Sequence, residues 1–257
     1  MSQIPVSVFL ITKNEADRLG RSLEAVAGFA DEIIVVDSGS DDRTCEIAGS
    51  FGAKVIQNVP FPGYGEQKRF AEKQCRNDWV LNIDADEVVS DQLRAEIEHL
   101  LGSDMDPRVC YEIRIIDMLP SETSPSVFAY SLYPVRLYNL KYGRYNPSTV
   151  HDRVDMDQQT RIVRLAGAIL HYSVRSLGQQ MEKLLKYAEL QSSEYCSSGR
   201  KLSKFRIFFE FPFAFLKSYL FRKNIFRGTC GFLISINYAY YRTIRIAMIY
   251  EKILLNK

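Results

Sequence analysis

Short apolar runs alternate with helical patterns through the first hundred residues of the chain. Each run has the length and composition of one strand, and in the segments between the runs apolar residues recur every three or four positions. Four such runs lie at residues 6–11, 32–36, 54–56 and 79–83. Strands that alternate with helices predict a parallel sheet with helices on both faces, and therefore an α/β fold.

Shorter β-like runs separated by turn-rich segments follow, and we assign them to a second half of the same domain. They lie at 111–116, 135–138, 162–166 and 168–172. Ser176 and Gln179 have the spacing of a capping box, and apolar residues at helical spacing follow them. This pattern predicts a helix that closes the domain, which then ends near residue 199.

Polar residues cluster directly after three of the first four runs, at 12–15, 37–42 and 84–87. In open parallel sheets, ligands bind beyond the carboxyl ends of the strands, so these clusters mark the expected binding edge. The sequence has no G-x-G-x-x-G segment after the first strand and no G-x-x-x-x-G-K-[ST] segment. Their absence argues against an NAD-type fold and a P-loop, and leaves phosphate binding to metal and side chains.

The third cluster carries three carboxylates within four residues, because Asp84, Asp86 and Glu87 directly follow a run typical of a buried strand. Adjacent like charges raise each other's pKa and cost stability unless a cation offsets them. Mg2+ and Mn2+ are usually held by one or two carboxylates together with substrate phosphates. The cluster therefore predicts a nucleotide-diphosphate site with a metal. The alternative is an acidic turn before a helix, since Ser90 and Asp91 precede a helical pattern.

Composition narrows the class of protein. The chain has 257 residues, enough for one large α/β domain and a smaller appendage. Its net charge of +2 is unevenly distributed, because residues 200–257 hold twelve Lys and Arg against two acidic residues. The five cysteines show no C-x-x-C spacing, which indicates neither a disulfide framework nor a zinc site and fits a reducing compartment. The N-terminus has no signal-like segment, so we expect the catalytic body to stay in the cytoplasm.

Three ordered motifs resemble those of the family 2 glycosyltransferases with a GT-A fold. They are VSVFLITKNE at 6–15, EIIVVDSGSDD at 32–42 and DWVLNIDADE at 78–87. VHDRV at 150–154 and HYS at 171–173 are similar to the branch that contains bacterial lipopolysaccharide-core glucosyltransferases. The resemblance extends over residues 4–190 and implies a Rossmann-like GT-A fold with a mostly parallel central sheet.

The resemblance also implies roles for individual residues. It implies that Asp37 hydrogen-bonds the uracil ring, that Asp84 lies near the ribose, and that Asp86 binds the Mg2+ or Mn2+ that bridges the donor diphosphate. Taken alone, Asp37 could cap the next helix and Asn14 could be a turn residue, but the order of the three motifs favours the functional roles. The residues implied to line the nucleotide pocket are Thr12, Asn14 and Glu15.

The implied reaction displaces a sugar from UDP by an acceptor hydroxyl, through an oxocarbenium-like transition state. Charge accumulates on the leaving diphosphate, and a metal neutralises it. Family 2 enzymes invert the anomeric centre in one displacement, which requires a carboxylate near the acceptor hydroxyl as general base. We assign this role to Asp152; the alternative is an ordinary ion pair between Asp152 and Arg153.

Two further residues are candidates for the donor site. His171 is expected to contact the metal or the diphosphate, and its alternative is a structural role on a strand. Lys68 is expected to face the pocket if the loop that contains Gly63 and Gly65 folds over the donor. The neighbouring Arg69 is assigned to a solvated helix face.

The C-terminal segment interleaves aromatic and basic residues. Residues 205–250 hold fourteen Phe and Tyr and seven Lys and Arg, and the longest uncharged run, 228–241, has fourteen residues. A bilayer span needs about 18–20 apolar residues. We therefore expect two amphipathic helices that lie in the membrane surface. The alternatives are helices packed on the catalytic body with a solvated basic face, and a single-stranded nucleic-acid surface, which no recognised motif supports.

Together these observations predict a GT-A glycosyltransferase domain over residues 1–199, with a nucleotide-sugar half of 1–105 and an acceptor half of 106–199, and a membrane-docking tail over 200–257. The predicted activity is metal-dependent transfer of a hexose, with glucose from UDP-glucose as the first choice. The predicted acceptor is a membrane-borne, lipid-linked glycan, with the inner-core heptose of lipopolysaccharide or lipooligosaccharide as the first choice. We expect no nucleic-acid partner and a peripheral location on the inner face of the bacterial inner membrane. A polyprenyl-phosphate-linked acceptor and a non-catalytic UDP-binding scaffold on the membrane stay open as alternatives.

Overall fold

Two compact units make up the chain. The computed structural model describes residues 5–103, 105–120, 122–148, 152–197 and 202–255. The first unit combines Met1–Ile116 with Ser131–His171, and the second combines Asp117–Tyr130 with Tyr172–Lys257. The second unit therefore takes one internal segment as well as the C-terminal part of the chain.

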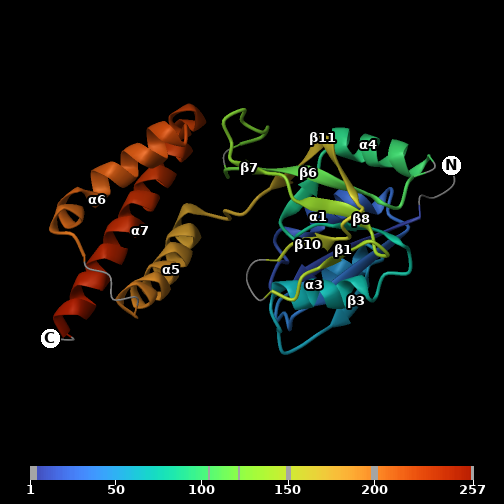
Figure 1. Ribbon diagram of the computed structural model, residues 1–257, viewed down its shortest axis with the longest axis horizontal. Helices are drawn as coiled ribbons and strands as arrows, with labels where there is room; N and C mark the ends of the chain where they lie inside the picture. The colour runs from blue at the N-terminus through green and yellow to red at the C-terminus, as the bar shows by residue number, and fades with distance from the viewer. Residues whose placement is uncertain (1–4, 104, 121, 149–151, 198–201, 256–257) are drawn as a thin grey trace. The chain divides into compact units, whose positions relative to one another are not determined.

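The first unit is built on one large sheet and a small separate ribbon (Figure 1). The strands are β1 (Val6–Thr12), β2 (Glu32–Asp37), β3 (Lys54–Gln57), β4 (Trp79–Asn82), β5 (Glu87–Val89), β6 (Val109–Asp117), β7 (Ser131–Leu132), β8 (Val135–Asn139), β9 (Gly143–Tyr145), β10 (Val154–Met156) and β11 (Arg161–His171). The sheet has the order β3-β2-β1-β4-β8-β6-β11-β5, and β7 pairs with β6. Strands β3, β2, β1 and β4 are parallel, and the sheet continues from β4 to β8 and β6 by antiparallel pairing. Strands β9 and β10 form the ribbon.

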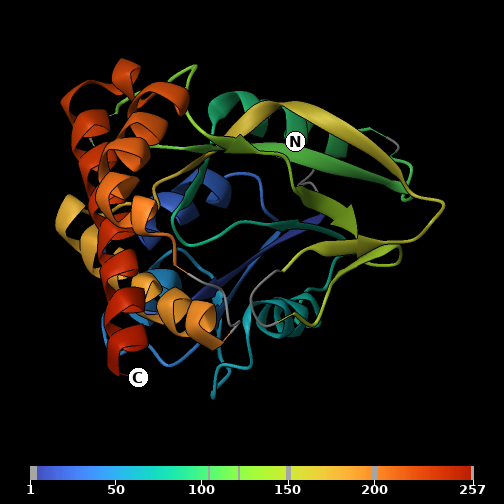
Figure 2. The ribbon, with the colours of Figure 1, turned by 60° about the vertical axis from the view of Figure 1, so that its left-hand side comes forward.

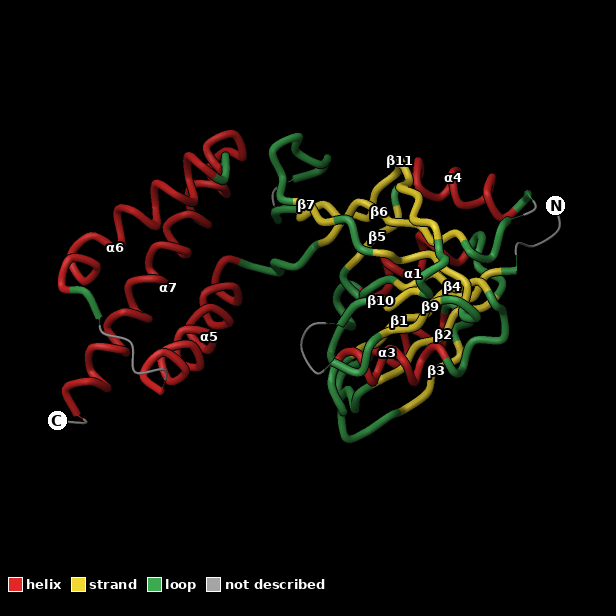
Figure 3. Tube along the Cα trace, viewed as in Figure 1, coloured by secondary structure: helices red, strands yellow, loops and turns green. Residues whose placement is uncertain are grey.

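Helices cover both faces of this sheet, and Figure 3 shows them flanking the strands. Successive side chains of a strand point to opposite faces, so the buried strand β1 contributes to two apolar layers. Val8 and Leu10 share one layer with α1 (Leu19–Ala27), α2 (Thr44–Ser50) and α4 (Asp91–Leu101). Phe9 lies in the other layer with α3 (Tyr64–Glu72). The predicted α/β fold class, with a mostly parallel central sheet between helices, is confirmed.

Strand β11 corrects one detail of the sequence analysis. The predicted strands at 162–166 and 168–172 form a single strand that runs through Gly167. A Cβ atom on Gly167 would lie 2.3 Å from the Cα atom of Leu93. The glycine therefore allows a close approach between the strand and helix α4, and it does not interrupt the strand. The other predicted strands agree with the structure to within one or two residues at their ends.

Helices make up most of the second unit, which is therefore named the helical unit. They are α5 (Leu177–Ser197), α6 (Lys204–Leu216), a π-helical turn (Lys217–Phe221), a 3-10 turn (Asn224–Arg227) and α7 (Gly228–Leu255). Figure 2 shows α6 and α7 side by side, and α7 also packs against α5. In the described part of the chain, no helix combines the length and hydropathy that a bilayer span requires.

Helix α5 belongs with the C-terminal helices by its contacts. The Tyr241 hydroxyl and Arg245 Nη1 both donate to Gln191 Oε1, at 2.7 Å, and Lys252 Nζ donates to Ser192 Oγ at 2.9 Å. This packing between residues far apart in the sequence explains why the division of the chain differs from the predicted boundary near residue 199.

The internal segment Asp117–Tyr130 is tied to the turn between α6 and α7. Arg227 Nη2 lies 2.6 Å from Glu122 Oε2 and donates to the Asp117 carbonyl oxygen at 2.8 Å. The rings of Phe128 and Phe226 are stacked, with their centroids 4.5 Å apart. Burial alone would raise the pKa of Glu122, but Arg227 and a backbone amide more than offset it, so that pKa is lowered and the pair stays charged.

Substituting Gly167 with alanine should destabilise the first unit, the sheet unit. The added methyl group would meet the backbone of Leu93, and overpacking of this kind costs about 1–3 kcal/mol. Gly49 in α2 is the control, because a Cβ atom there would have no neighbour within 4 Å and alanine is favoured in a helix by about 0.5–1 kcal/mol. Urea unfolding should show a lower midpoint for Gly167→Ala and an equal or higher one for Gly49→Ala. Equal losses in both variants would contradict the close-approach explanation.

Candidate active site

The candidate site forms where β1, β2 and β4 end, at one edge of the parallel part of the sheet. Hydrogen bonds join the loops that follow β1 and β2. The Asn14 amide donates to Ser40 Oγ at 2.8 Å, and the Asp41 amide donates to Asn14 Oδ1 at 3.0 Å. Asn14 has a φ of 56°, a left-handed conformation that asparagine adopts more readily than most residues. The predicted polar clusters of these two strands are therefore one connected structure.

Asp37 organises the loop after β2. Its buried carboxylate accepts hydrogen bonds from Thr12 Oγ1 at 3.1 Å, from the Gly39 and Ser40 amides at 2.9 and 2.8 Å, and from the Ser40 hydroxyl at 2.5 Å. Gln57 Nε2 lies 3.4 Å away as a further donor. Thr12 and Asp37, both predicted to line the nucleotide pocket, are thus in direct contact. The predicted contact of Asp37 with uracil stays a prediction.

Arg18 links Glu15, predicted to line the nucleotide pocket, to Asp86, predicted to bind the metal. Asp86 in turn contacts the other predicted metal ligand, His171. Arg18 contacts both carboxylate oxygens of Glu15, at 2.5 and 3.0 Å, and its Nη1 lies 3.2 Å from Asp86 Oδ2. His171 Nε2 lies 3.4 Å from the same oxygen. The antiparallel pairing of β11 with β5 sets His171 opposite Glu87 and so brings it beside Asp86. Burial raises the pKa of Asp86, but His171 and Arg18 outweigh it, and the net shift is downward.

The donor set at Asp86 suits a metal that arrives with its substrate. In the regions that the structure describes, no group of three or more His, Cys, Asp or Glu side chains could hold a metal ion. Asp86 Oδ2 and His171 Nε2 lie 3.4 Å apart and offer one oxygen and one nitrogen ligand. Mg2+ in nucleotide sites takes one or two protein carboxylates and completes its coordination with phosphate oxygens and water. The pair therefore fits a diphosphate-bound cation, with Arg18 as a competing positive charge.

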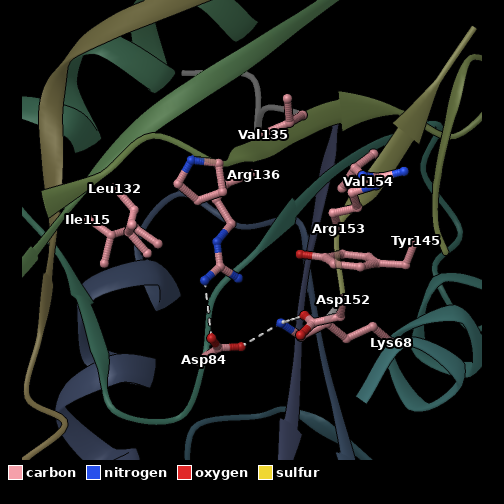
Figure 4. A pocket seen from close by; sticks show the side chains of 11 residues that line it. Lys68, Asp84, Ile115, Leu132, Val135, Arg136, Tyr145, Asp152, Arg153 and Val154 are labelled. Carbon is pink, nitrogen blue, oxygen red and sulfur yellow. Dashed lines mark hydrogen bonds and ion pairs between the residues drawn. The ribbon is translucent and has the colours of Figure 1, made fainter. Parts of the chain in front are cut away.

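Lys68 connects two of the predicted site carboxylates (Figure 4). Its ammonium nitrogen lies 2.9 Å from Asp84 Oδ1 and 2.8 Å from Asp152 Oδ2, although the two aspartates are far apart in sequence. The side chain is only 4% exposed, and its nitrogen lies 5.0 Å from the centre of the Tyr145 ring. Burial alone would lower the pKa of Lys68, but Asp84, Tyr145 and Asp152 raise it on balance. Lys68 is therefore a charged group held between two carboxylates.

Arg136, on β8, is a second buried cation that the sequence analysis missed. Its Nη2 lies 3.1 Å from Asp84 Oδ2 and 2.8 Å from Glu87 Oε1, and its Nη1 donates to Asn82 Oδ1. Burial raises the pKa of Asp84, but Lys68 and Arg136 outweigh it and the pKa is lowered. Glu87 shares the same arginine, and its complete burial raises its pKa. The sequence does contain a signal for this contact, because Arg136 lies inside the β-like run at 135–138. An arginine that is buried on a strand needs an anionic partner.

Helix α3 and the β9–β10 ribbon hold Lys68 and Asp152 together. Tyr145 on β9 donates its backbone amide to Glu72 Oε1 at 2.9 Å, and its hydroxyl donates to Asn82 Oδ1 at 2.6 Å. At the other end of α3, the Gly65 amide donates to the Ser148 carbonyl oxygen at 2.9 Å, and a Cβ atom on Gly65 would lie 2.1 Å from the Asn146 carbonyl oxygen. Gly65 therefore lets the segment before Asp152 lie directly on α3.

The two alternatives for Asp152 are now distinguishable by geometry. Arg153 Nε pairs with Asp155 Oδ1 at 3.0 Å, whereas Asp152 pairs with Lys68. His151, which belongs to the segment that resembles the family motif, lies outside the described residues. The alternative, an ion pair between Asp152 and Arg153, is thus not formed, and the assignment of Asp152 as a base stays a prediction.

Lys68, Asp84 and Asp152 line a cavity of about 250 Å³. Its polar wall also includes Arg136 and Tyr145, and its apolar wall is formed by Ile115, Leu132, Pro134, Val135 and Val154 (Figure 4). Pockets for drug-sized ligands have volumes of about 300–1,000 Å³, so this cavity suits one part of a larger substrate. The polar lining also includes Arg153, and a small cavity with two carboxylates and three cations fits a polar, hydroxyl-rich group.

The chain has matches among protein-family models, known proteins and solved structures. Residues 7–156 match the model of Glycosyl transferase family 2. The chain is 40% identical over 260 residues to an uncharacterized glycosyltransferase of Rickettsia felis. This alignment covers 98% of this chain and 92% of the relative. It is 31% identical over 264 residues to a lipopolysaccharide core biosynthesis glycosyltransferase of Rhizobium meliloti, with coverage of 97% and 93%. The structure of Mycobacterium tuberculosis glucosyl-3-phosphoglycerate synthase with Mn2+, UDP and glucosyl-3-phosphoglycerate is 25% identical over 45% of this chain and 44% of that chain, with a TM-score of 0.34.

Replacing Lys68 with methionine should reduce the loss of stability in acid. The folded-state pKa of Asp84 is lowered below the value of about 3.9 in an unfolded chain, so ionised Asp84 stabilises the fold above that pH. This contribution is lost as the pH falls through the folded-state pKa. Without the ammonium of Lys68, the pKa of Asp84 in the folded protein lies closer to its pKa in the unfolded chain. A smaller part of the free energy of unfolding then depends on pH.

Urea unfolding between about pH 5 and pH 2 measures this effect. Glu87 interferes little in the lower part of this range, because below about pH 4 it is protonated in the folded state and largely protonated in the unfolded state. The control is Lys73→Met, because Lys73 is exposed at the end of α3. The explanation is wrong if the Lys68 variant loses stability in acid as steeply as the wild type and the control.

Proposed function

Because the chain belongs to Glycosyl transferase family 2, we propose that it transfers a hexose, with inversion, from a uridine diphosphate sugar to a hydroxyl group of a lipid-linked glycan. The family rests on the match over residues 7–156 and on relatives aligned over nearly their whole length. The observation that carries the finer proposal is the placement of Asp84 and Asp152 on one buried lysine in one cavity.

The donor would lie along the edge where the parallel strands end. In this proposal Asp37 and Thr12, which contact each other, bind the uracil end, and Asn14 and Glu15 line the same pocket. Asp84 follows β4, the strand beside β1, so the donor would extend from the end of β2 across the end of β1 toward Lys68. An ammonium held in a poorly solvated site stabilises negative charge strongly. Lys68 would therefore favour departure of the diphosphate.

The acceptor would enter on the side of Asp152. As the acceptor oxygen attacks the anomeric carbon, its proton passes to a carboxylate oxygen of Asp152, and the bond from that carbon to the diphosphate oxygen breaks. The products are a glycoside of inverted configuration and UDP. Lys68 contacts Asp84 and Asp152 at once, and its movement from Asp152 toward the diphosphate would leave the carboxylate able to accept the proton.

Asp86 and His171 would hold Mg2+ or Mn2+ with the donor diphosphate. The oxygen and nitrogen atoms that they offer lie 3.4 Å apart, and the diphosphate would supply further oxygens. Such a cation neutralises charge that develops on the leaving group.

Acceptor class and location form part of the same proposal. The Rhizobium meliloti relative is named for lipopolysaccharide core biosynthesis, which supports a core glycan, with an inner-core heptose as the first choice and glucose as the first donor. The helical unit carries strongly exposed aromatic residues, among them Phe208 and Phe221 with exposed fractions of 77% and 81%. Aromatic side chains interleaved with basic ones favour a membrane–water interface. We place the protein peripherally on the inner face of the bacterial inner membrane.

Release of UDP by the purified chain tests the proposed reaction. The assay combines Mg2+ or Mn2+, a panel of UDP-sugars, and core lipopolysaccharide that ends in heptose, with each donor also measured without acceptor. Release from one donor that depends on the acceptor would support the proposal and identify both substrates. UDP binding without release from any donor would favour the non-catalytic scaffold.

Asp152→Asn should lose transfer and keep donor binding. The amide cannot accept the proton, and loss of a general base lowers the rate by about 10²–10⁴-fold. Asp155→Asn is the matched control, because Asp155 lies on β10 with an exposed side chain and forms its ion pair with Arg153. Turnover and UDP affinity are measured for both variants. Turnover of Asp152→Asn within a few-fold of the control would assign the base to another residue.

Asp86→Ala should remove the metal dependence of UDP binding. The wild type is expected to bind UDP more tightly with Mn2+ than with a chelator, because Asp86 supplies the carboxylate ligand. Isothermal titration with and without Mn2+ measures the difference, and Asp78→Ala, at an exposed aspartate paired with Lys141, is the control. A variant that keeps the full Mn2+ enhancement would contradict the assignment of Asp86.

A further inference from the structure

A cavity of about 750 Å³ lies within the helical unit. Its lining comes from four places in the sequence: the internal segment Asp117–Tyr130, the chain around the start of α5, the turn between α6 and α7, and α7 itself. Six of the lining residues carry a positive charge or an aromatic ring: Phe128, Tyr130, Phe221, Arg222, Lys223 and Arg227. The cavity is therefore both basic and aromatic.

Arg222 and Lys223 keep their positive charges available to a ligand. Among the described residues, neither forms an ion pair with a carboxylate; each lies over an aromatic ring. The Arg222 guanidinium carbon is 4.6 Å from the centre of the Tyr238 ring, and Lys223 Nζ is 5.0 Å from the centre of the Phe128 ring. A ring face attracts a cation and restrains its position without neutralising it. The two cations are thus positioned in advance for an anion, which lowers the cost of binding.

The other charged groups around the cavity do not cancel this excess. Arg227 is bound to Glu122 through two short contacts, so this arginine serves to hold the wall of the cavity. Asp117 also lines the cavity. The lining therefore holds three basic side chains and one acidic one, and Glu122 offsets only Arg227, so the balance favours an anionic ligand.

The cavity is bordered by exposed apolar side chains. Phe221 and Tyr130, both in the lining, are 81% and 64% exposed, and the adjacent Phe226 and Val127 are 63% and 82% exposed. Large apolar side chains in such numbers around a basic cavity match a ligand with a charged head and a hydrocarbon tail, because aromatic residues favour the level of lipid headgroups.

We propose that this cavity binds the phosphate group of a membrane lipid, with Arg222 and Lys223 on the phosphate and the surrounding aromatic residues in the acyl boundary. A phosphomonoester carries a charge of about −1.5 to −2, which two cations without carboxylate partners match better than the single charge of a phosphodiester. The inference rests on the proposed membrane association and adds a specific headgroup site to it. A lipid held here would fix the orientation of the helical unit on the bilayer.

The double variant Arg222→Gln, Lys223→Asn removes both charges, and we expect it to keep the fold. Both side chains are exposed, and asparagine suits the left-handed conformation of Lys223, whose φ is 59°. The matched control is Lys183→Gln, Lys186→Gln, which removes two exposed charges from α5 outside the cavity lining. Full-length proteins are sedimented with vesicles of phosphatidylcholine that contain phosphatidic acid or phosphatidylglycerol at matched surface charge.

The wild type and the control should prefer phosphatidic acid, and the double variant should lose that preference. Each basic residue near an anionic surface contributes about 1 kcal/mol, so the double variant should bind phosphatidic acid vesicles about tenfold or more weakly than the control. Equal losses in the two double variants, or no preference in the wild type, would overturn the proposal in favour of diffuse attraction. Binding of glycerol 3-phosphate as tight as binding of phosphatidic acid vesicles would also overturn it, because the site would then recognise a soluble phosphate without a lipid tail.

This experiment is independent of the reaction, since no sugar donor is present. If the wild type binds no vesicles, the proposed membrane association itself fails; if it binds without headgroup preference, only the cavity proposal fails.

Discussion

The contact of Lys68 with Asp84 and Asp152 is the constraint on which the candidate site depends. A buried charge is costly unless it is paired, and removing one partner of a buried pair typically costs about 3–5 kcal/mol. Lys68 pairs with an aspartate from the sheet edge and with an aspartate from the segment after the β9 strand, so one buried charge links the two sides of the pocket. Arg136 performs the same role between Asp84 and Glu87. Charge pairing therefore links the elements that form the polar wall of the pocket.

This constraint reaches the rest of the sheet unit through helix α3. Glu72, near the end of the helix, accepts hydrogen bonds from the Tyr138 hydroxyl and the Tyr145 amide, each from a different strand. Gly65, near its beginning, lies against the backbone just before Asp152. Both ends of α3 are thus fixed, and Lys68 lies between them. The donor and acceptor sides of the pocket are held in register by one short helix.

The sequence predicts most of the parallel sheet because its information is local. Apolar runs of strand length, polar residues after them and helical spacing between them all lie within short windows, and the structure reproduces those strands. Three ordered motifs then selected the right family, and the structure brings Asp86 to His171 and Lys68 to Asp152.

The features that escaped prediction depend on residues far apart in the chain. Arg136 finds its partners Asp84 and Glu87 at separations of 52 and 49 residues, which no local pattern reveals. The change of charge near residue 200 is a real property of the sequence, yet α5 packs with α7 because of contacts such as that between Gln191 and Tyr241. The strand through Gly167 was divided in prediction because glycine usually marks a break, whereas here it admits a neighbouring helix.

The internal segment Asp117–Tyr130 makes the helical unit discontinuous in sequence. The chain passes between the two units three times, after Ile116, Tyr130 and His171. No single cut can therefore separate an intact catalytic unit from an intact helical one, and a chain shortened after α5 would leave Glu122 without Arg227 and the Phe128 ring without Phe226. Because the helical unit is made of two separate stretches of the chain, it cannot be exchanged between proteins as a module in the way that a continuous C-terminal tail can.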